Sequence, residues 1–167
     1  MSIQIVLPEK LFNKLREAGL DYEAYIFDII LKELKLDPMD ELEVHLELAE
    51  RFLEEGRQLI DKDPVQASEK LYKVAEETIK ALAIHFKLTE ILAKVNERGR
   101  WIASELDDVA RIASKKLGEW FYDAWDHAWT LHVWGFHEAK LNIEGIKARY
   151  PYVERMVMEI KRIMKGN

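Results

Sequence analysis

The fold is decided by Glu119–Glu138, EWFYDAWDHAWTLHVWGFHE, which holds four of the five tryptophans and three of the five histidines of the chain. At 100° per residue, one face of a helix through this stretch is apolar over an arc of about 100°, the width of a stripe that faces a core. A second strip beside it is also aromatic and indicates a partner surface, with Trp120 and Trp134 as candidate interface residues. The core stripe consists of Phe121, Trp125, Ala128, Trp129, His132, Phe136 and Ala139.

The bulk composition predicts one main helical domain. A chain of 167 residues can bury one sizeable core. Its apolar share of 49% and charged share of 34% exclude disorder, and proline and glycine are too scarce for a loop-rich β protein. The net charge of −6 argues against an extended nucleic-acid surface. Without cysteine, the chain has no disulfide, thiolate metal site or cysteine nucleophile.

The termini and hydropathy bear on location. The N-terminus MSIQIVLPEK has no basic lead, and no run reaches about 18 apolar residues, so neither export nor a membrane span is expected. We therefore expect a cytoplasmic protein. Abundant Glu, Lys and Arg with little Asn and Gln resembles the composition of thermophilic proteins.

The first 37 residues predict a strand followed by two helices. Residues 2–7 alternate in polarity, Pro8 opens a helix that Gly19 ends, and a second helix runs to Asp37-Pro38. This order resembles the ribbon-helix-helix unit. A lone strand has no partner within such a unit, so Ile3, Gln4 and Ile5 are expected to pair with a second copy in a homodimer. We therefore divide the chain into a dimerisation appendage, 1–37, and a helical bundle, 38–167.

DNA binding through residues 1–37 is the alternative for this unit. Ribbon-helix-helix proteins read DNA with the outward face of the paired strand, which here carries only Ser2, Gln4 and Val6. Up to Leu36 the chain has five basic and six acidic residues, which attract phosphate poorly. Dimerisation is therefore the preferred role, and a DNA-binding regulator remains the alternative.

Residues 38–167 predict an up-and-down bundle. A heptad pattern runs from Met39 to Lys62, and Asp63-Pro64 starts the next helix, which extends to Phe86. On that helix Lys70, Lys73 and Lys80 alternate with glutamates, which indicates a solvated face of mixed charge rather than a basic binding stripe. Further helices are expected at 89–96 and 101–117, then a loop or irregular helix at 141–149 and a last helix opened by Tyr150-Pro151.

A phosphate or nucleobase could be met by the arginines around Trp101. The candidates are Arg98, Arg100, Trp101 and Arg111, and the alternative is a loop with ordinary surface arginines. Glycine-rich phosphate loops, a nucleophile elbow and the HExxH zinc motif are all missing from the sequence, so the common enzyme signatures are absent.

Two segments carry a family resemblance. Leu46–Ala83, LELAERFLEEGRQLIDKDPVQASEKLYKVAEETIKALA, and Leu131–Leu141, LHVWGFHEAKL, together with the GRW at Gly99–Trp101, resemble the archaeal PaREP family, encoded by repeated genomic elements. The resemblance implies an all-α fold related to the HEPN helical bundles. These dimerise and often act in RNA cleavage, in toxin–antitoxin pairs or beside minimal nucleotidyltransferases.

The resemblance also implies where catalysis would lie. HEPN ribonucleases carry an arginine followed, after four to six residues, by a histidine; here His132 stands in the arginine's place before His137. His137 is the better candidate for proton transfer, with Asp126 and Glu138 as further candidates, whereas His132 faces the core stripe. A metal site is not expected, because residues five apart on a continuous α-helix point about 140° apart.

Three functions follow from these patterns. The first is a dimeric, non-catalytic HEPN-like interaction protein without a cofactor, acting with a nucleotidyltransferase or a nucleic acid. The second is a divergent, metal-independent ribonuclease that uses His132 and His137. The third is the DNA-binding regulator.

Overall fold

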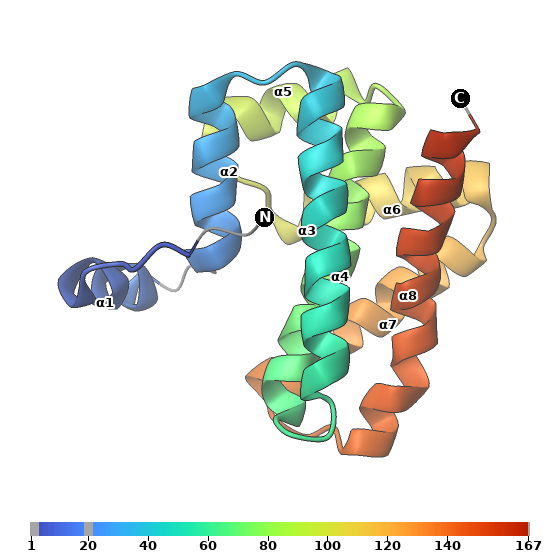
Figure 1. Cartoon of the computed structure of the whole chain (residues 1–167). Helices are drawn as coiled ribbons and strands as arrows, with labels where there is room; N and C mark the ends of the chain where they lie inside the picture. Colours follow the sequence, from blue (N-terminus) through green and yellow to red (C-terminus); the bar gives the residue numbers. More distant parts are fainter. Residues whose placement is uncertain (1–3, 19–21, 167) are drawn as a thin grey trace.

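The chain folds entirely into helices in the computed structural model, which describes residues 4–18 and 22–166. No strand occurs in these ranges. The elements are α1 (Glu9–Glu17), α2 (Tyr22–Leu34), α3 (Pro38–Leu59), α4 (Pro64–His85), α5 (Thr89–Arg98), α6 (Ala103–Leu117), α7 (Trp120–Thr130), the π-helix η1 (Leu131–His137) and α8 (Ile143–Lys165). Figure 1 shows α3, α4 and α8 running side by side, with α1 projecting away from them.

The two longest central helices form an antiparallel hairpin whose ends are set by local sequence. Asp37 accepts hydrogen bonds from the backbone N–H groups of Met39 and Asp40 and starts α3, with Pro38 in the first turn. Asp63 accepts one from Gln66 N at 3.1 Å and starts α4, as the sequence predicts. The short turn between them lays α4 along α3 (Figure 1).

The hydrophobic core surrounds α4, which contacts α3, α6, α7, η1 and α8. Burial on several sides explains why most of α4 is inaccessible to solvent. The Trp-rich helix α7 supplies the opposite wall of the core, as its apolar stripe predicts. The fully buried large side chains include Phe52, Leu71, Ile79, Leu82, Phe121, Leu131, Ile146, Met156 and Ile160.

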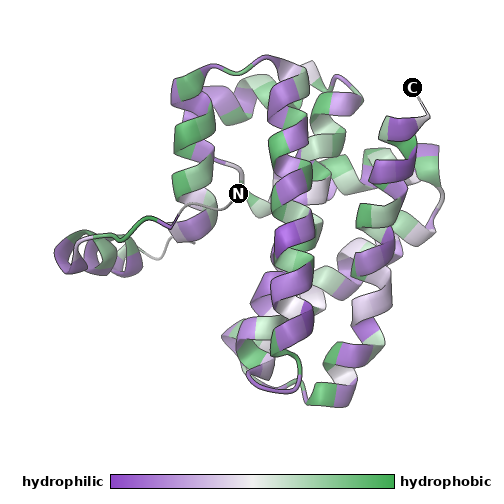
Figure 2. Ribbon diagram, viewed as in Figure 1, coloured by the Kyte–Doolittle hydropathy of each residue, from purple (hydrophilic) through white to green (hydrophobic). Residues whose placement is uncertain are grey.

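The N-terminal arm, residues 4–18 and 22–37, shares little apolar surface with the bundle, and Phe27 of α2 packs against the hydrophobic core. Helix α1 buries no residue, and α2 buries only Ala24 and Leu31. Residues 4–8 have no regular secondary structure, so the strand predicted there is not formed in the single chain. A strand needs a hydrogen-bonding neighbour, and no other segment of the described residues forms a strand beside this one. Ile3 lies outside the described residues. Apolar residues alternate with polar ones along α1 and α2 (Figure 2).

The last helix corrects a boundary. Helix α8 starts at Ile143 rather than at Tyr150-Pro151, and Pro151 lies inside it. Asn142 caps this start by accepting a hydrogen bond from Gly145 N at 2.8 Å. Ile146 is fully buried in the first turn, and this packing outweighs the hydrogen bond that Pro151 removes.

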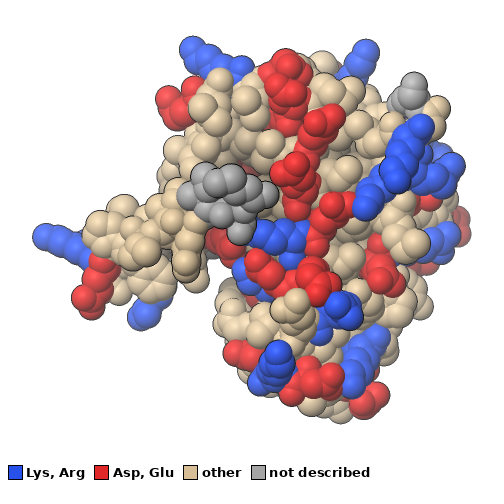
Figure 3. Space-filling model, viewed as in Figure 1, with Lys and Arg blue, Asp and Glu red and all other residues tan. Residues whose placement is uncertain are grey.

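Acidic side chains run down the face of the molecule over α3 (Figure 3), a face that repels a polyanion. Within the described part of the chain, no helix is both long enough and apolar enough to cross a membrane.

Candidate functional site

The paired histidines meet because the Trp-rich helix changes its winding. At Leu131 the α-helix α7 gives way to the π-helix η1, in which hydrogen bonds join residues five apart, as between Glu138 N and Val133 O at 2.9 Å. Side chains five residues apart therefore share a face. His137 Nε2 lies 3.1 Å from His132 Nε2. The expectation that these two side chains diverge is wrong, because it assumed a continuous α-helix.

Gly135 fixes the π-helix against α4. A Cβ atom at this position would lie 2.3 Å from Ser68 Oγ and 2.5 Å from Ser68 Cβ, far closer than any real contact. The backbone of η1 thus rests directly on α4, and only glycine permits that approach. Because Ser68 neighbours Glu69 on α4, the same contact brings His132 to the Glu69 carboxylate.

Glu69, His132 and His137 form a hydrogen-bonded chain. His132 Nδ1 lies 2.9 Å from Glu69 Oε2, and the His132 ring stacks on Tyr72 with centroids 4.1 Å apart. A carboxylate only accepts, so Nδ1 of His132 is the donor. A neutral His132 then accepts at Nε2 from the Nε2–H group of His137. This assignment leaves Nδ1 of His137 with a free lone pair, and His137 is exposed.

The two histidines line a cavity of about 670 Å³ between the N-terminal arm and the bundle. Helix α4 supplies its floor with Glu69, Tyr72 and Lys73, and the start of α6 supplies one wall next to Trp101. The arm covers it with residues of α1 and α2. A cavity of this size admits a small ligand or part of a polymer. The residues that bear on its chemistry are Arg16, Lys70, Lys73, Tyr72, Trp101 and Glu76.

The lysines of α4 belong to ion pairs rather than to a solvated face. Lys70 Nζ lies 2.8 Å from Glu23 Oε2 and 2.7 Å from Glu55 Oε2, and Lys73 Nζ lies 3.2 Å from Glu23 Oε2. Lys73 is 5% exposed and Lys80 is fully buried, so the prediction of a solvated stripe is wrong for both. Helices α2 and α3 cover this face with carboxylates that the lysines bind.

Lys80 is the centre of a buried charge cluster. Its Nζ lies 3.1 Å from Asp28 Oδ1 and 2.9 Å from both Glu76 Oε1 and Glu77 Oε1. Burial alone would lower the pKa of Lys80, but the three carboxylates raise it well above its usual value. Burial likewise opposes ionisation of Glu77, yet the charges of Lys80 and His45 lower its pKa to about 2. Desolvation raises the pKa of Asp28.

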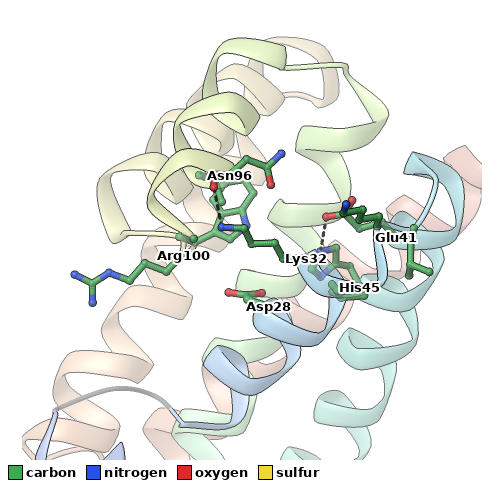
Figure 4. A pocket seen from close by; sticks show the side chains of 12 residues that line it. Asp28, Lys32, Glu41, His45, Asn96 and Arg100 are labelled. Atoms are coloured by element: carbon green, nitrogen blue, oxygen red, sulfur yellow. Dashed lines mark hydrogen bonds and ion pairs between the residues drawn. The ribbon is translucent and has the colours of Figure 1, made fainter.

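A second, smaller cavity of about 300 Å³ lies between α2, α3 and α5. Figure 4 shows Asp28 and His45 at its base, Lys32 reaching the Asn96 carbonyl, and the Arg100 guanidinium turned away. Lys32 Nζ donates to that carbonyl at 3.1 Å. His45 Nδ1 lies 2.6 Å from Glu77 Oε2, so its ring is tied to the Lys80 cluster.

Of the predicted phosphate-binding residues, Arg98 and Arg100 line one hollow of about 400 Å³ beside α2. Arg100 and Trp101 line the smaller cavity, and Trp101 also lines the histidine cavity. Arg98 is paired with Glu105, its Nη2 atom 2.6 Å from Oε1, and Arg111 is paired with Asp108 on α6. Arg111 therefore does not belong to the hollow that Arg98 and Arg100 line.

The remaining candidates, Asp126 and Glu138, do not line the histidine cavity. Asp126 is exposed in a separate hollow beside Trp129, which is 39% exposed although its position in the apolar stripe predicts core. Glu138 pairs with Lys140 at 2.6 Å. His, Asp and Glu side chains nowhere gather in threes around a possible metal position in the described ranges.

The predicted interface residues differ in what they contact. Trp120 is engaged within the bundle: its indole N–H donates to Leu117 O at 2.7 Å, and Arg155 lies 3.9 Å over its ring. Trp134 is 56% exposed, and Ile5 is 72% exposed in the arm, next to the exposed Gln4.

Comparison with known proteins identifies the family of the chain. Two solved structures of a structural-genomics target from Sulfolobus solfataricus are similar to this chain. The crystal structure has 40% sequence identity and a TM-score of 0.62, and the match covers 66% of this chain and 91% of that one. The solution structure has 39% sequence identity and a TM-score of 0.53, and the match covers 71% of this chain and 86% of that one. No curated protein matches. The model of the archaeal PaREP1/PaREP8 family matches residues 44–157, which include α4, η1 and both paired histidines, and the chain therefore belongs to that family.

Proposed function

We propose that the protein is an acid–base ribonuclease whose reactive group is His137. The observation that carries this proposal is the chain from Glu69 through His132 to His137, which ends at the exposed His137 ring on the edge of a cavity. In this proposal the bundle is HEPN-like, and His132 occupies the position of the usual arginine. His132 does not touch the substrate but positions His137.

RNA supplies its own nucleophile, the 2′-hydroxyl group. In the proposed reaction this oxygen attacks the adjacent phosphorus, and His137 Nδ1 accepts its proton. The charge that His137 gains is shared through His132 with the carboxylate of Glu69. The bond between phosphorus and the 5′-oxygen breaks, and the relay returns a proton to that oxygen. The products are a 2′,3′-cyclic phosphate and a free 5′-hydroxyl group.

The walls of the cavity suit a nucleotide. Trp101 offers aromatic surface on which a base can stack, and Gln66 offers an amide for hydrogen bonds. The acidic side chains over α3 would disfavour binding of a long RNA along that face (Figure 3). These features favour a short single-stranded RNA segment as the substrate that binds in the cavity.

The test is cleavage of mixed-sequence RNA by purified protein. We expect 2′,3′-cyclic phosphate ends, loss of cleavage in His137→Ala, and unchanged cleavage in His85→Ala, a histidine that lies outside the cavity. An oligonucleotide with 2′-deoxyribose at every position must stay intact, because it lacks the nucleophile. Absence of cleavage by the unaltered protein, or equal cleavage by His137→Ala, would refute the proposal.

We also propose that the N-terminal arm joins two copies of the chain. Of the thirteen large apolar residues exposed in the described part, seven lie in the arm, between residues 5 and 34. Residues 4–7 have no regular secondary structure, and a second copy can pair with their backbone groups as a strand. We expect Val6→Asp and Leu34→Asp to shift sedimentation toward the monomer and Met158→Asp, equally apolar and exposed on α8, to leave it unchanged. A monomeric unaltered protein would exclude this role.

A further inference from the structure

Arg16 is the residue of the histidine cavity that the proposed chemistry still needs. Resting on the proposed function, we propose that Arg16, in the last turn of α1, binds the phosphate that the paired histidines act on. The site is then assembled from the N-terminal arm and the bundle.

The cavity requires a cation for its substrate. A phosphodiester gains negative charge as the 2′-oxygen attacks, and Glu23, Glu69 and Glu76 already line the cavity with carboxylates. Lys70 and Lys73 do not offset this charge, because both are bound to Glu23. A phosphate would have to break those pairs to use either lysine.

Arg16 is the cation there that remains available. It lines the same cavity as His132 and His137, is exposed, and has no carboxylate within ion-pair distance among the described residues. Its guanidinium presents a planar fork that can bind two phosphate oxygens at once, which an ammonium group cannot do. More than a hundred residues separate Arg16 from His132 in the chain, so no local motif contains both.

The arm is held where Arg16 can reach the cavity. Glu23 of α2 binds Lys70 and Lys73 on α4 and Arg51 on α3, the last at 2.9 Å. Helix α1 packs on α2 through an edge-to-face contact between Phe12 and Tyr22, whose ring centroids lie 5.0 Å apart. Both aromatic rings line the cavity beside Arg16. Ion pairs thus fix α2, and the aromatic contact fixes α1 upon it.

The experiment compares Arg16→Ala and Arg16→Lys with Lys10→Ala, an exposed cation on the same helix that does not line the cavity. We expect Arg16→Ala to lower kcat/KM for RNA cleavage by about 100-fold, Arg16→Lys to recover part of the loss, and Lys10→Ala to match the unaltered protein. Guanidinium chloride at millimolar concentration should restore cleavage to Arg16→Ala when sodium chloride at equal ionic strength does not. A purely structural role of Arg16 would not be rescued in this way.

The outcomes separate this inference from the proposed function. Cleavage that depends on His137 but is unaffected by Arg16→Ala overturns the role of Arg16 and leaves the ribonuclease intact. If the unaltered protein cleaves no RNA, binding of a 2′-O-methyl oligonucleotide still tests Arg16. We then expect binding about ten times weaker in Arg16→Ala than in Lys10→Ala, and equal binding overturns the inference.

Discussion

Gly135 of η1 and Ser68 of α4 lie so close that a methyl group on the glycine would overlap the serine side chain. This contact joins the two elements that carry the candidate site, because His132 and His137 flank Gly135 and Glu69 follows Ser68. The π-helical winding that pairs the histidines is therefore tied to tertiary packing on α4. Stability and site geometry should change together when this contact is altered.

Replacing Gly135 with alanine should separate η1 from α4. We expect a loss of about 1–3 kcal/mol in the free energy of unfolding, as for other overpacked interiors, together with loss of the imidazole pairing. Urea unfolding measures the first, and the ring nitrogen resonances of His132 and His137 report the second. Ser68→Gly removes both clashing atoms, so the double variant should lose less than the sum of the single variants. Additive losses would show that the Gly135–Ser68 contact does not hold the π-helix.

Glu69→Gln tests the relay without emptying it. The glutamine oxygen can still accept from Nδ1 of His132, but it brings no charge to stabilise an imidazolium. We expect kcat for RNA cleavage to fall by about 10–100-fold with KM unchanged, the range seen when the partner of a functional histidine is altered. Glu138→Gln, which lies beside His137 in sequence and pairs with Lys140, serves as the control. Equal activity in both variants would remove Glu69 from the mechanism.

Local sequence patterns predict most of the helices of the bundle. Asp63-Pro64 starts α4 because capping is decided within four residues, and the apolar stripe of α7 faces the core because its period matches a helix. The N-terminal strand could not be settled in this way, since a strand requires a partner that the single chain does not contain. The start of α8 differs from the prediction because Tyr150-Pro151 has the pattern of a helix start, whereas Asn142 caps the helix that contains Pro151.

Local sequence does not predict most of the candidate site. The five-residue spacing of His132 and His137 is visible in the sequence, but their convergence depends on Ser68, more than sixty residues away. Glu69 and Lys73 looked solvated, because the polar side of an amphipathic helix does not reveal which neighbours will cover it. Here α2 and α3 cover it with carboxylates. Ring stacking of Tyr72 on His132 has no counterpart in the sequence pattern.

Replacing Lys80 should lower the stability of the fold more than replacing an exposed lysine, because Lys80 is buried with three carboxylates. Lys80→Met removes the charge that compensates Asp28, Glu76 and Glu77, and we expect a loss of about 3–5 kcal/mol in the free energy of unfolding. Lys14→Ala breaks the exposed pair with Glu17 and should change it by less than about 1 kcal/mol. Chemical unfolding of both variants decides; similar small losses would mean that the cluster does not stabilise the fold.

The same cluster should make the free energy of unfolding fall at acid pH, because Glu77 becomes protonated. Its pKa of about 2 in the folded chain lies below the ordinary value of 4.5, so its contribution is fully present above pH 4.5 and is lost as the pH falls toward 2. At 1.36 kcal/mol per pKa unit, this contribution is on the order of 3 kcal/mol, and the raised pKa of Asp28 offsets part of it. Urea unfolding at pH 7 and pH 3 should show a smaller difference for Glu77→Gln than for the unaltered protein. Glu47→Gln, an exposed carboxylate on α3, should retain the full difference. If Glu77→Gln also retains it, the acid sensitivity of the fold arises elsewhere.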